Sequence, residues 1–316
     1  MDRVIGGYFE LELRRGEHYH KNALCINTAR NCFEYILLAR KYKKIYIPFF
    51  TCEVMLQPLH KHHIEYEFYS INFDLELQDI KSLQEDEAIL YTNYFGLKQS
   101  YIEKLVSIYH TQLIVDNSQA FYASRFSDID TFYSPRKFFG VPDGAYLYTD
   151  CLLDCDFLRD RSHDRMTHLL QRIEEGAEAG YHSFKIDDES LDNKPIQKMS
   201  RLTQRLLCNI DYDKIKEKRL KNYAVLDNLL HKQNLLHLKL SVGDVPMVYP
   251  FYCENLHMKK YLIENKVFVA TYWPNIFDWC NISDVEYTLC QHLLPLPIDQ
   301  RYNEDDMEEI FKLMKG

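Results

Sequence analysis

The sequence predicts an α/β fold, in which a large domain with a mainly parallel sheet precedes a small α+β domain. Over roughly the first half of the chain, short apolar segments alternate with segments of helical character. Strands that alternate with helices require crossover connections, which favour parallel pairing. Beyond the polar stretch 187–194 the pattern changes to helices with a few strands. We place the large domain, with an N-terminal arm, at 1–212 and the small domain at 213–316.

Strands of the large domain are expected where apolar and β-branched or aromatic residues gather, at 24–26, 44–50, 64–69, 88–92, 112–115, 131–133 and 145–148. Asn27 or Thr28 is a good N-cap for a helix that runs to about Arg40. Further helices are expected at 51–60, 79–83 and 101–109. A long charged helix is expected from 156 to 178, and the polar stretch 187–194 is interpreted as a linker or mobile loop.

In the C-terminal part, helices are expected at 198–208, 213–232 and 255–265. Strands are expected at 248–252 and 267–272, and an apolar segment at 293–298 precedes a terminal helix at 303–315.

Composition excludes several classes of protein. The 316 residues carry a net charge of −9, and no Lys/Arg run is long enough for a nucleic-acid interface. We expect no signal peptide and no membrane span, since nowhere do about eighteen apolar residues follow one another. The nine scattered cysteines are typical of reduced thiols in a cytosolic protein. His60, His62 and His63 do not converge on one helix face, so we interpret them as a solvated turn and expect no metal.

Polar and aromatic side chains gather where the expected strands end. In parallel sheets, ligands bind at the carboxyl ends of the strands. No G-x-G-x-x-G or P-loop pattern occurs, so a dinucleotide site is not predicted. The residues in question are Thr28, Phe50, Tyr94, Asp116, Gln119 and Lys137.

Lys137 lies on a tight loop between two strands. Pro135 delays any helix, and Gly140 and the turn 142–144 reverse the chain. The neighbours are aromatic, so we expect hydrophobic walls around the amine, which would favour the neutral form that a Schiff-base lysine needs. A lysine that is simply solvated at a loop edge is the alternative reading of this segment alone.

Taken together, these motifs resemble the sugar aminotransferases of the DegT/DnrJ/EryC1/StrS type, which are fold-type I pyridoxal-phosphate (PLP) enzymes. The resemblance runs from about residue 20 to the end of the chain and implies a mainly parallel, seven-stranded-type sheet. The motifs that carry it are Thr28-Ala29, Pro48-Phe49-Phe50-Thr51, Asp116-Asn117-Ser118-Gln119, Pro135-Arg136-Lys137-Phe138-Phe139-Gly140 and Asp143-Gly144.

The resemblance implies a role for each residue. Lys137 would form the Schiff base with the cofactor and move the proton during transfer, while Asp116 would pair with the pyridinium nitrogen. Gln119 would donate to the phenolic oxygen of the ring, and Ser118 would lie against the ring face. Thr28 and Ala29 would bind the phosphate.

Two positions depart from the family pattern. Cys52 stands where an aromatic residue usually stacks on the cofactor, so Phe50 or Tyr94, or the sulfur itself, would take that place. Phe132 stands where a phosphate-binding serine is common, and Ser134 is the nearby substitute. The asparagine that the family supplies from the dimer partner has no clear match, although 181–183 fall in that region.

The resemblance thus implies a cytosolic, homodimeric, PLP-dependent aminotransferase that acts on a keto sugar carried by a nucleotide, with glutamate as amino donor. Two alternatives remain open. A sugar dehydrase of this family would have histidine in place of the lysine, and Lys137 argues against it. A protein that keeps the fold but has lost catalysis, and serves for binding or regulation, is favoured by the changes at Cys52 and Phe132.

Overall fold

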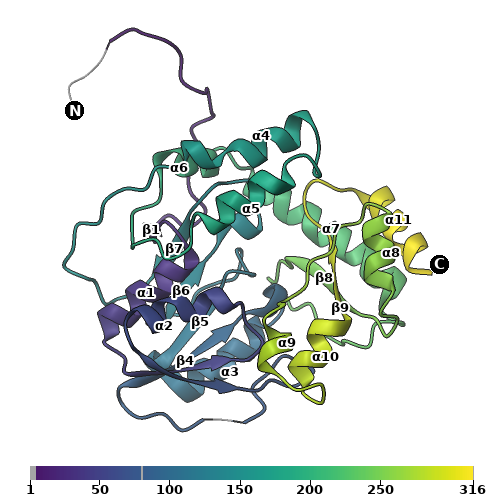
Figure 1. Ribbon diagram of the computed structural model, residues 1–316, viewed down its shortest axis with the longest axis horizontal. Coiled ribbons are helices and arrows are strands. Elements are labelled where there is room, and N and C mark those ends of the chain that lie inside the picture. Colours follow the sequence, from purple (N-terminus) through teal and green to yellow (C-terminus); the bar gives the residue numbers. More distant parts are fainter. Residues whose placement is uncertain (1–4, 80, 316) are drawn as a thin grey trace.

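The computed structural model describes residues 5–79 and 81–315. Its centre is a seven-stranded sheet with the strand order β1-β7-β6-β5-β4-β2-β3 (Figure 1). Strands β2 to β6 are parallel, whereas β7 is antiparallel to both β6 and β1. The strands are β1 (Leu24–Ile26), β2 (Lys44–Pro48), β3 (Glu65–Tyr69), β4 (Glu87–Thr92), β5 (Leu113–Asn117), β6 (Asp130–Tyr133) and β7 (Ala145–Tyr148). The mainly parallel sheet predicted from the sequence is confirmed.

Alternate residues of the central strands enter two separate buried clusters, one on each face of the sheet. In β2, Ile45 and Ile47 face one cluster while Tyr46 faces the other. The first face packs against α1 (Ala29–Arg40) and α2 (Gln57–Lys61), and the second against α3 (Gln99–Tyr109) and the C-terminal half of the chain. This strict alternation fixes the register, because a shift by one residue would turn every side chain to the wrong face.

The C-terminal half is built around the antiparallel pair β8 (Val248–Tyr252) and β9 (Leu293–Pro297). Its buried residues belong to the same cluster as the second face of the large sheet, so the two sheets share one core. The remaining helices are α4 (Thr167–Glu174), α5 (Tyr181–Glu189), α6 (Arg201–Leu207), α7 (Tyr212–Leu230), α8 (Met258–Glu264), α9 (Ile276–Trp279), α10 (Val285–His292) and α11 (Glu304–Lys315).

Two expected elements of the large domain are wrong. No long helix spans 156–178: only α4 and a short 3-10 turn, His163–Arg165, are helical there. The chain before them is extended, because the Asp160 amide donates to the Lys198 carbonyl at 2.9 Å and the Lys198 amide donates to the Leu158 carbonyl at 2.8 Å. No helix forms at 79 or 81–83, where the Lys81 amide donates to the Tyr109 hydroxyl instead; Ile80 lies outside the described residues.

Two expectations further along also change. The expected linker 187–194 begins inside α5, where buried Asp187 accepts a hydrogen bond from His168 Nδ1 at 2.6 Å. The expected strand 267–272 does not form, since β9 occupies the place beside β8. Among residues 5–79 and 81–315, no helix has the length and apolar character that crossing a bilayer requires.

Candidate functional site

The topology brings the loops after β2, β4, β5 and β6 to one edge of the sheet. Asp116 in β5 lies level with Thr92 of β4 and Phe132 of β6. Because β7 runs in the opposite direction, its first residues and the end of β1 lie at the same edge. The residues selected from the sequence therefore come together around the carboxyl ends of the parallel strands, where ligands of such sheets bind.

Asp116 is a buried carboxylate at the centre of this edge, only 5% exposed. One carboxylate oxygen accepts a hydrogen bond from the Ser118 amide at 2.7 Å. Burial raises the pKa of Asp116, while the hydrogen bonds from Ser118 and the charge of Lys137 oppose that rise. A buried carboxylate with so few partners is well suited to pair with a cationic group of a ligand.

Lys137 ends a short 3-10 turn, Pro135–Lys137, that follows β6. Its positive charge acts on three groups of this edge, Asp116, Cys52 and Asp188. The expectation of hydrophobic walls around the amine is wrong: Lys137 is exposed, while the aromatic rings of Phe138 and Phe139 turn into the core.

Gln119 lies beside Asp116 and is buried. Its Oε1 accepts a hydrogen bond from the Phe95 amide at 2.9 Å, which fixes the orientation of the side-chain amide. Since the oxygen is engaged, the NH₂ group remains as the donor toward a ligand. Ser118 is half-buried between the two.

Thr28 is the N-cap of α1, as the sequence predicts. Its hydroxyl oxygen accepts from the Asn31 amide at 3.1 Å, and its O–H donates to Asn31 Oδ1 at 2.6 Å. A hydroxyl has one proton to donate, so the donors left to an anion are the amides of Ala29 and Arg30, which have no partner within the helix. The helix dipole adds positive potential at this end.

The aromatic residues of this edge are packed in the core. Phe50 is fully buried, with its ring edge-on to Trp273 at 5.2 Å and tilted toward Tyr94 at 5.6 Å. Phe132 is also in the core, next to Phe33. At the two positions that depart from the family pattern, Cys52 is half-buried, and Ser134, the nearby substitute for Phe132, is buried. Burial raises the pKa of the Cys52 thiol, and the charges of Lys137 and Arg30 act against it.

Two arginines at this edge were missed by sequence reasoning. Arg136 Nη2 forms an ion pair with Asp188 at 2.7 Å, and Arg30 pairs with Asp192. Burial alone would raise the pKa of Asp188, but the charges of Arg136 and Lys137 outweigh it and hold the pKa below its usual value. Both acidic partners come from the stretch interpreted as a linker. The sequence does contain a signal for both arginines. Arg30 directly follows the motif Thr28-Ala29, and Arg136 directly precedes Lys137.

The geometry thus combines a buried carboxylate, an exposed amine whose charge reaches it, an oriented amide donor and a helix N-terminus. Such a set can hold a flat cationic ring by its nitrogen and an anionic group at the helix end, with the amine near the ring. The assignments of individual residues to a cofactor remain predictions, namely those of Thr28, Ala29, Phe50, Cys52, Asp116, Ser118, Gln119, Ser134 and Lys137.

Neither protein-family models nor curated protein sequences give a match to this chain. Solved structures do. A DegT/DnrJ/EryC1/StrS aminotransferase from Brucella abortus is 16% identical with a TM-score of 0.63, over 93% of this chain and 85% of that one. The sugar aminotransferase CalS13 from Micromonospora echinospora is 11% identical, with a TM-score of 0.60 over 93% and 86%. NtdA from Bacillus subtilis, solved with bound cofactor PMP, is 14% identical, with a TM-score of 0.62 over 93% and 73%.

At these identities the similarity concerns the arrangement of the backbone. It extends over nearly the whole chain, including the C-terminal half with β8 and β9. The resemblance read from the motifs is therefore confirmed at the level of structure: the chain has the fold of the DegT/DnrJ/EryC1/StrS aminotransferases.

Proposed function

We propose that the protein is a PLP-dependent aminotransferase. The observation that carries this proposal is the buried carboxylate of Asp116 at the ligand edge of the sheet, on which the charge of the nearby Lys137 acts. The bound PMP in NtdA, which shares this fold, supports the same cofactor class. Neither a dinucleotide nor a nucleotide triphosphate is favoured, because the chain lacks the glycine patterns that bind them.

The residues of the edge fit the cofactor. Asp116 would hold the ring nitrogen, since a buried carboxylate gains most from a cationic partner. Gln119 would donate its NH₂ group to the phenolic oxygen. The amides of Ala29 and Arg30 would receive the phosphate at the start of α1, with Thr28 fixing that turn. Cys52 and Ser134 would line the open side of the ring.

Bound PLP supplies an electron-withdrawing ring that stabilises negative charge on a neighbouring substrate carbon. The chain supplies the rest. Lys137 is the only one of these residues able both to bond to a carbonyl carbon and, as a free amine, to take up and return a proton. Asp116 would hold the protonated ring nitrogen as a carboxylate, a state that its hydrogen bonds from Ser118 and the charge of Lys137 favour.

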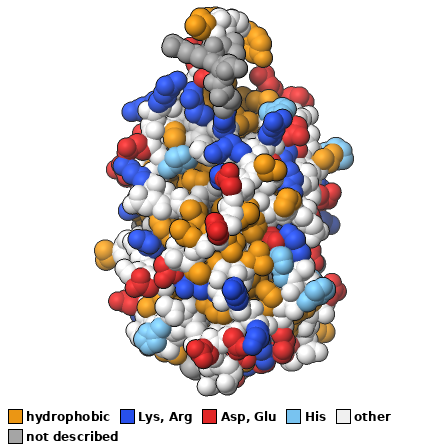
Figure 2. All heavy atoms as spheres, turned by 90° about the vertical axis from the view of Figure 1, so that its left-hand side faces the viewer, with side chains coloured by type: hydrophobic (Ala, Val, Ile, Leu, Met, Phe, Trp, Pro, Cys, Tyr) orange, Lys and Arg blue, Asp and Glu red, His pale blue; other side chains and the backbone are white. Residues whose placement is uncertain are grey.

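For the substrate we propose a keto sugar linked to a nucleotide, with glutamate as the amino donor. The sugar aminotransferase CalS13 among the similar structures supports a sugar as the substrate. A homodimer is supported by the hydrophobic side chains that gather in the middle of the face shown in Figure 2. A cytosolic location is supported by the nine cysteines, all of which are free thiols.

A fold-retaining protein without catalysis is the second candidate. The observation that favours it is that Phe50 is fully buried, with its ring beside those of Trp273 and Tyr94, while Cys52 takes the place of the stacking aromatic residue. In that case the cofactor would bind without reacting with any amino donor.

An absorption spectrum of the purified protein with added PLP tests the proposal. We expect a visible band that borohydride bleaches, that Lys137→Ala lacks and that the exposed control Lys221→Ala keeps. Addition of glutamate should convert the band to the ultraviolet absorption of the amine form. A band that no amino donor changes would support the second candidate. A band retained in Lys137→Ala would refute the role of this lysine.

A further inference from the structure

The turn that ends the lysine loop is tied to the start of α1. Gly144 precedes β7 and Asn27 follows β1, and the pairing of these two strands continues beyond their ends, because the Gly144 amide donates to the Asn27 carbonyl at 2.6 Å. Gly144 has a φ of +106°, and an added Cβ would lie 3.0 Å from the side chains of Met199 and Thr203. A glycine is therefore required for the turn to approach α6 this closely.

The segment 195–203 binds both sides of this junction, beginning with Asn27. Asn27 is fully buried, and its amide donates to the Gln197 carbonyl at 2.9 Å while its side-chain oxygen accepts from the Gln197 amide at 3.2 Å. Its Nδ2 group donates to the Pro195 carbonyl at 3.1 Å. Each polar group of Asn27 is thus engaged, and the segment pairs with the outer edge of β1 through Lys198.

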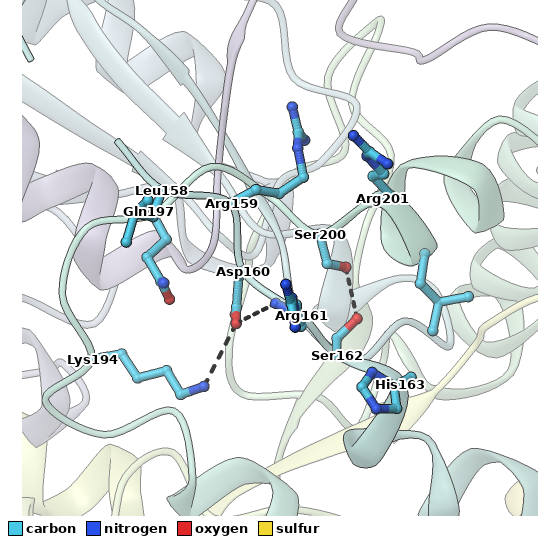
Figure 3. Close-up of a pocket in the computed structure, with 11 residues that line it drawn as sticks. Leu158, Arg159, Asp160, Arg161, Ser162, His163, Lys194, Gln197, Ser200 and Arg201 are labelled. Carbon is cyan, nitrogen blue, oxygen red and sulfur yellow. Dashed lines mark hydrogen bonds and ion pairs between the residues drawn. The ribbon is translucent and has the colours of Figure 1, made fainter. Parts of the chain in front are cut away.

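Asp143 supplies the second connection to the same segment. Its carboxylate is fully buried, and one oxygen accepts from the Ser200 amide at 2.9 Å. The other oxygen accepts from the Ser200 hydroxyl at 2.8 Å and from the Thr203 hydroxyl. Since the Ser200 proton is directed to Asp143, Ser162 must donate to Ser200 Oγ, at 2.7 Å (Figure 3). A carboxylate only accepts, so it suits a place where three donors converge.

These contacts close a ring of hydrogen bonds, which we call the clasp. Its members are Asn27, Asp143, Gly144, Gln197 and Ser200. Asn27 directly precedes Thr28, where α1 offers its free amides, and Asp143 lies in the turn that ends the lysine loop. Gln300 anchors the same loop elsewhere, because its Nε2 donates to the Phe138 carbonyl at 2.8 Å and so fixes the loop to the C-terminal part. The clasp instead fixes the loop to the start of α1.

We propose that Asp143 is a positioning residue, which sets the distance between the start of α1 and Lys137. The inference rests on the proposed function, since it concerns a ligand held at both places, by an anionic group at the helix and by a carbonyl carbon at the lysine. Two linked contacts strengthen each other only when the distance between them matches the ligand. A clasp of buried hydrogen bonds keeps that distance within a narrow range, because any donor left unpaired there costs free energy.

Three ligands distinguish positioning from a general effect on the fold. PLP reaches both places, pyridoxal lacks the phosphate, and inorganic phosphate lacks the aldehyde. In Asp143→Asn an NH₂ group replaces one acceptor oxygen and faces a donor, so the clasp loosens. We expect the affinity for PLP, measured from the visible band, to fall by roughly tenfold. The affinities for pyridoxal, from the same band, and for phosphate, by calorimetry, should change by less than about twofold, because each is held at one place only.

A second variant and a control accompany this comparison. Thr203→Val removes one of the three donors with little change in shape, and should show the same selective loss to a smaller extent. The buried carboxylate of Asp244 accepts from the Ser241 amide at 2.9 Å within the C-terminal part, so Asp244→Asn should bind all three ligands as the unaltered protein does. If Asp143→Asn gives no cooperative thermal melt, Thr203→Val decides the test.

Two results would overturn the inference and leave the cofactor proposal intact. Equal weakening of all three ligands in a clasp variant would show a general loss of structure and no positioning. Unchanged affinity for PLP in the folded clasp variants would show that other contacts set the distance. A different result, the absence of any band when PLP is added to the unaltered protein, would refute the cofactor proposal and this inference with it.

Discussion

At the scale of single residues, Asp116 shows how the site exchanges stability for binding. A carboxylate whose pKa is raised by burial is costly to keep ionised in the folded state. The ionised form is nevertheless the one that binds a cationic ligand, so the lost folding free energy is recovered on binding. Asp116 therefore destabilises the empty fold at neutral pH and contributes only when a ligand is present.

Asp116→Asn should separate these effects. The neutral amide can still accept from Ser118, so the unfolding midpoint of the protein without cofactor should stay equal or rise at pH 7. Activity should fall roughly a hundredfold or more, the usual loss when one preorganised electrostatic partner is removed. Thermal melts measure the unfolding midpoint, and turnover with an amino donor measures the activity. The exposed Asp154→Asn serves as control, and a lower midpoint for Asp116→Asn would contradict the argument.

His20 is a second residue whose environment determines a measurable property. The ring is buried, with Nε2 2.9 Å from the Phe121 carbonyl oxygen and the ring tilted against that of Tyr133. Burial lowers the pKa of His20 to about 4. The unfolded chain, with its pKa near 6.5, thus takes up a proton first as the pH falls, and stability is lost between about pH 6.5 and pH 4.

This protonation should cost about 2 kcal/mol of unfolding free energy between pH 7 and pH 5. In His20→Phe that part of the pH dependence should disappear, because the aromatic contacts remain but the titrating group does not. Denaturant melts at the two pH values measure the difference. His237→Phe, at an exposed position, should keep the full dependence, and the same slope in His20→Phe would show that other groups cause it.

At the scale of elements, an ion pair anchors α1 to the sheet. Arg40, in the last turn of α1, binds Asp130 at the start of β6 through Nε and Nη2, at 2.8 and 3.0 Å. Asp130 is 1% exposed, so it depends on this partner. The pair holds the far ends of the helix and strand whose other ends carry Thr28 and the lysine loop.

Arg40→Leu should lower the unfolding free energy by about 3 kcal/mol or more, because it leaves a buried charge without a partner. Adding Asp130→Asn should restore much of the loss, which a double-mutant cycle by urea melts would show as a large coupling energy. Asp150→Asn removes the exposed partner of the same arginine and should cost under about 1 kcal/mol. If the losses of unfolding free energy in Arg40→Leu and Asp130→Asn simply add in the double variant, the ion pair does not anchor α1.

The elements that the sequence predicted well are those with a strong local pattern. The strands 24–26 and 88–92 and the helix from Thr28 to Arg40 follow from apolar periodicity and one cap. The segments 156–178 and 267–272 were wrong for a non-local reason. The segment 156–178 pairs with the chain around Lys198. The segment 267–272 forms no strand, because β9 is the strand that pairs with β8. Such competition between distant segments leaves no trace in local composition.

At the scale of the whole molecule, topology explains why much of the site could be predicted. Any residue at the carboxyl end of a parallel strand arrives at one edge, so Asp116, Gln119 and Lys137 could be grouped without knowing a distance. The ion pair of Arg136 with Asp188 could not, because it depends on where α5 lies.

The two domains predicted at 1–212 and 213–316 lead to the last prediction. Hydrogen bonds cross that boundary at the ligand edge: Met247 N to the Phe95 carbonyl at 2.9 Å, Asn275 to the Thr51 carbonyl at 3.0 Å and Gln300 to the Phe138 carbonyl at 2.8 Å. One buried cluster also spans both parts. Residues that hold the site loops in place are thus supplied by the C-terminal part.

We therefore expect the full chain to unfold in a single transition, and a chain of residues 1–212 alone to lack a cooperative transition, because it would expose the second face of the sheet to water. Calorimetry on both chains, with circular dichroism for secondary structure, makes the comparison. Two resolved transitions in the full chain, or a cooperative melt of 1–212, would show instead that the large domain folds independently and that its ligand edge forms without help from the C-terminal part.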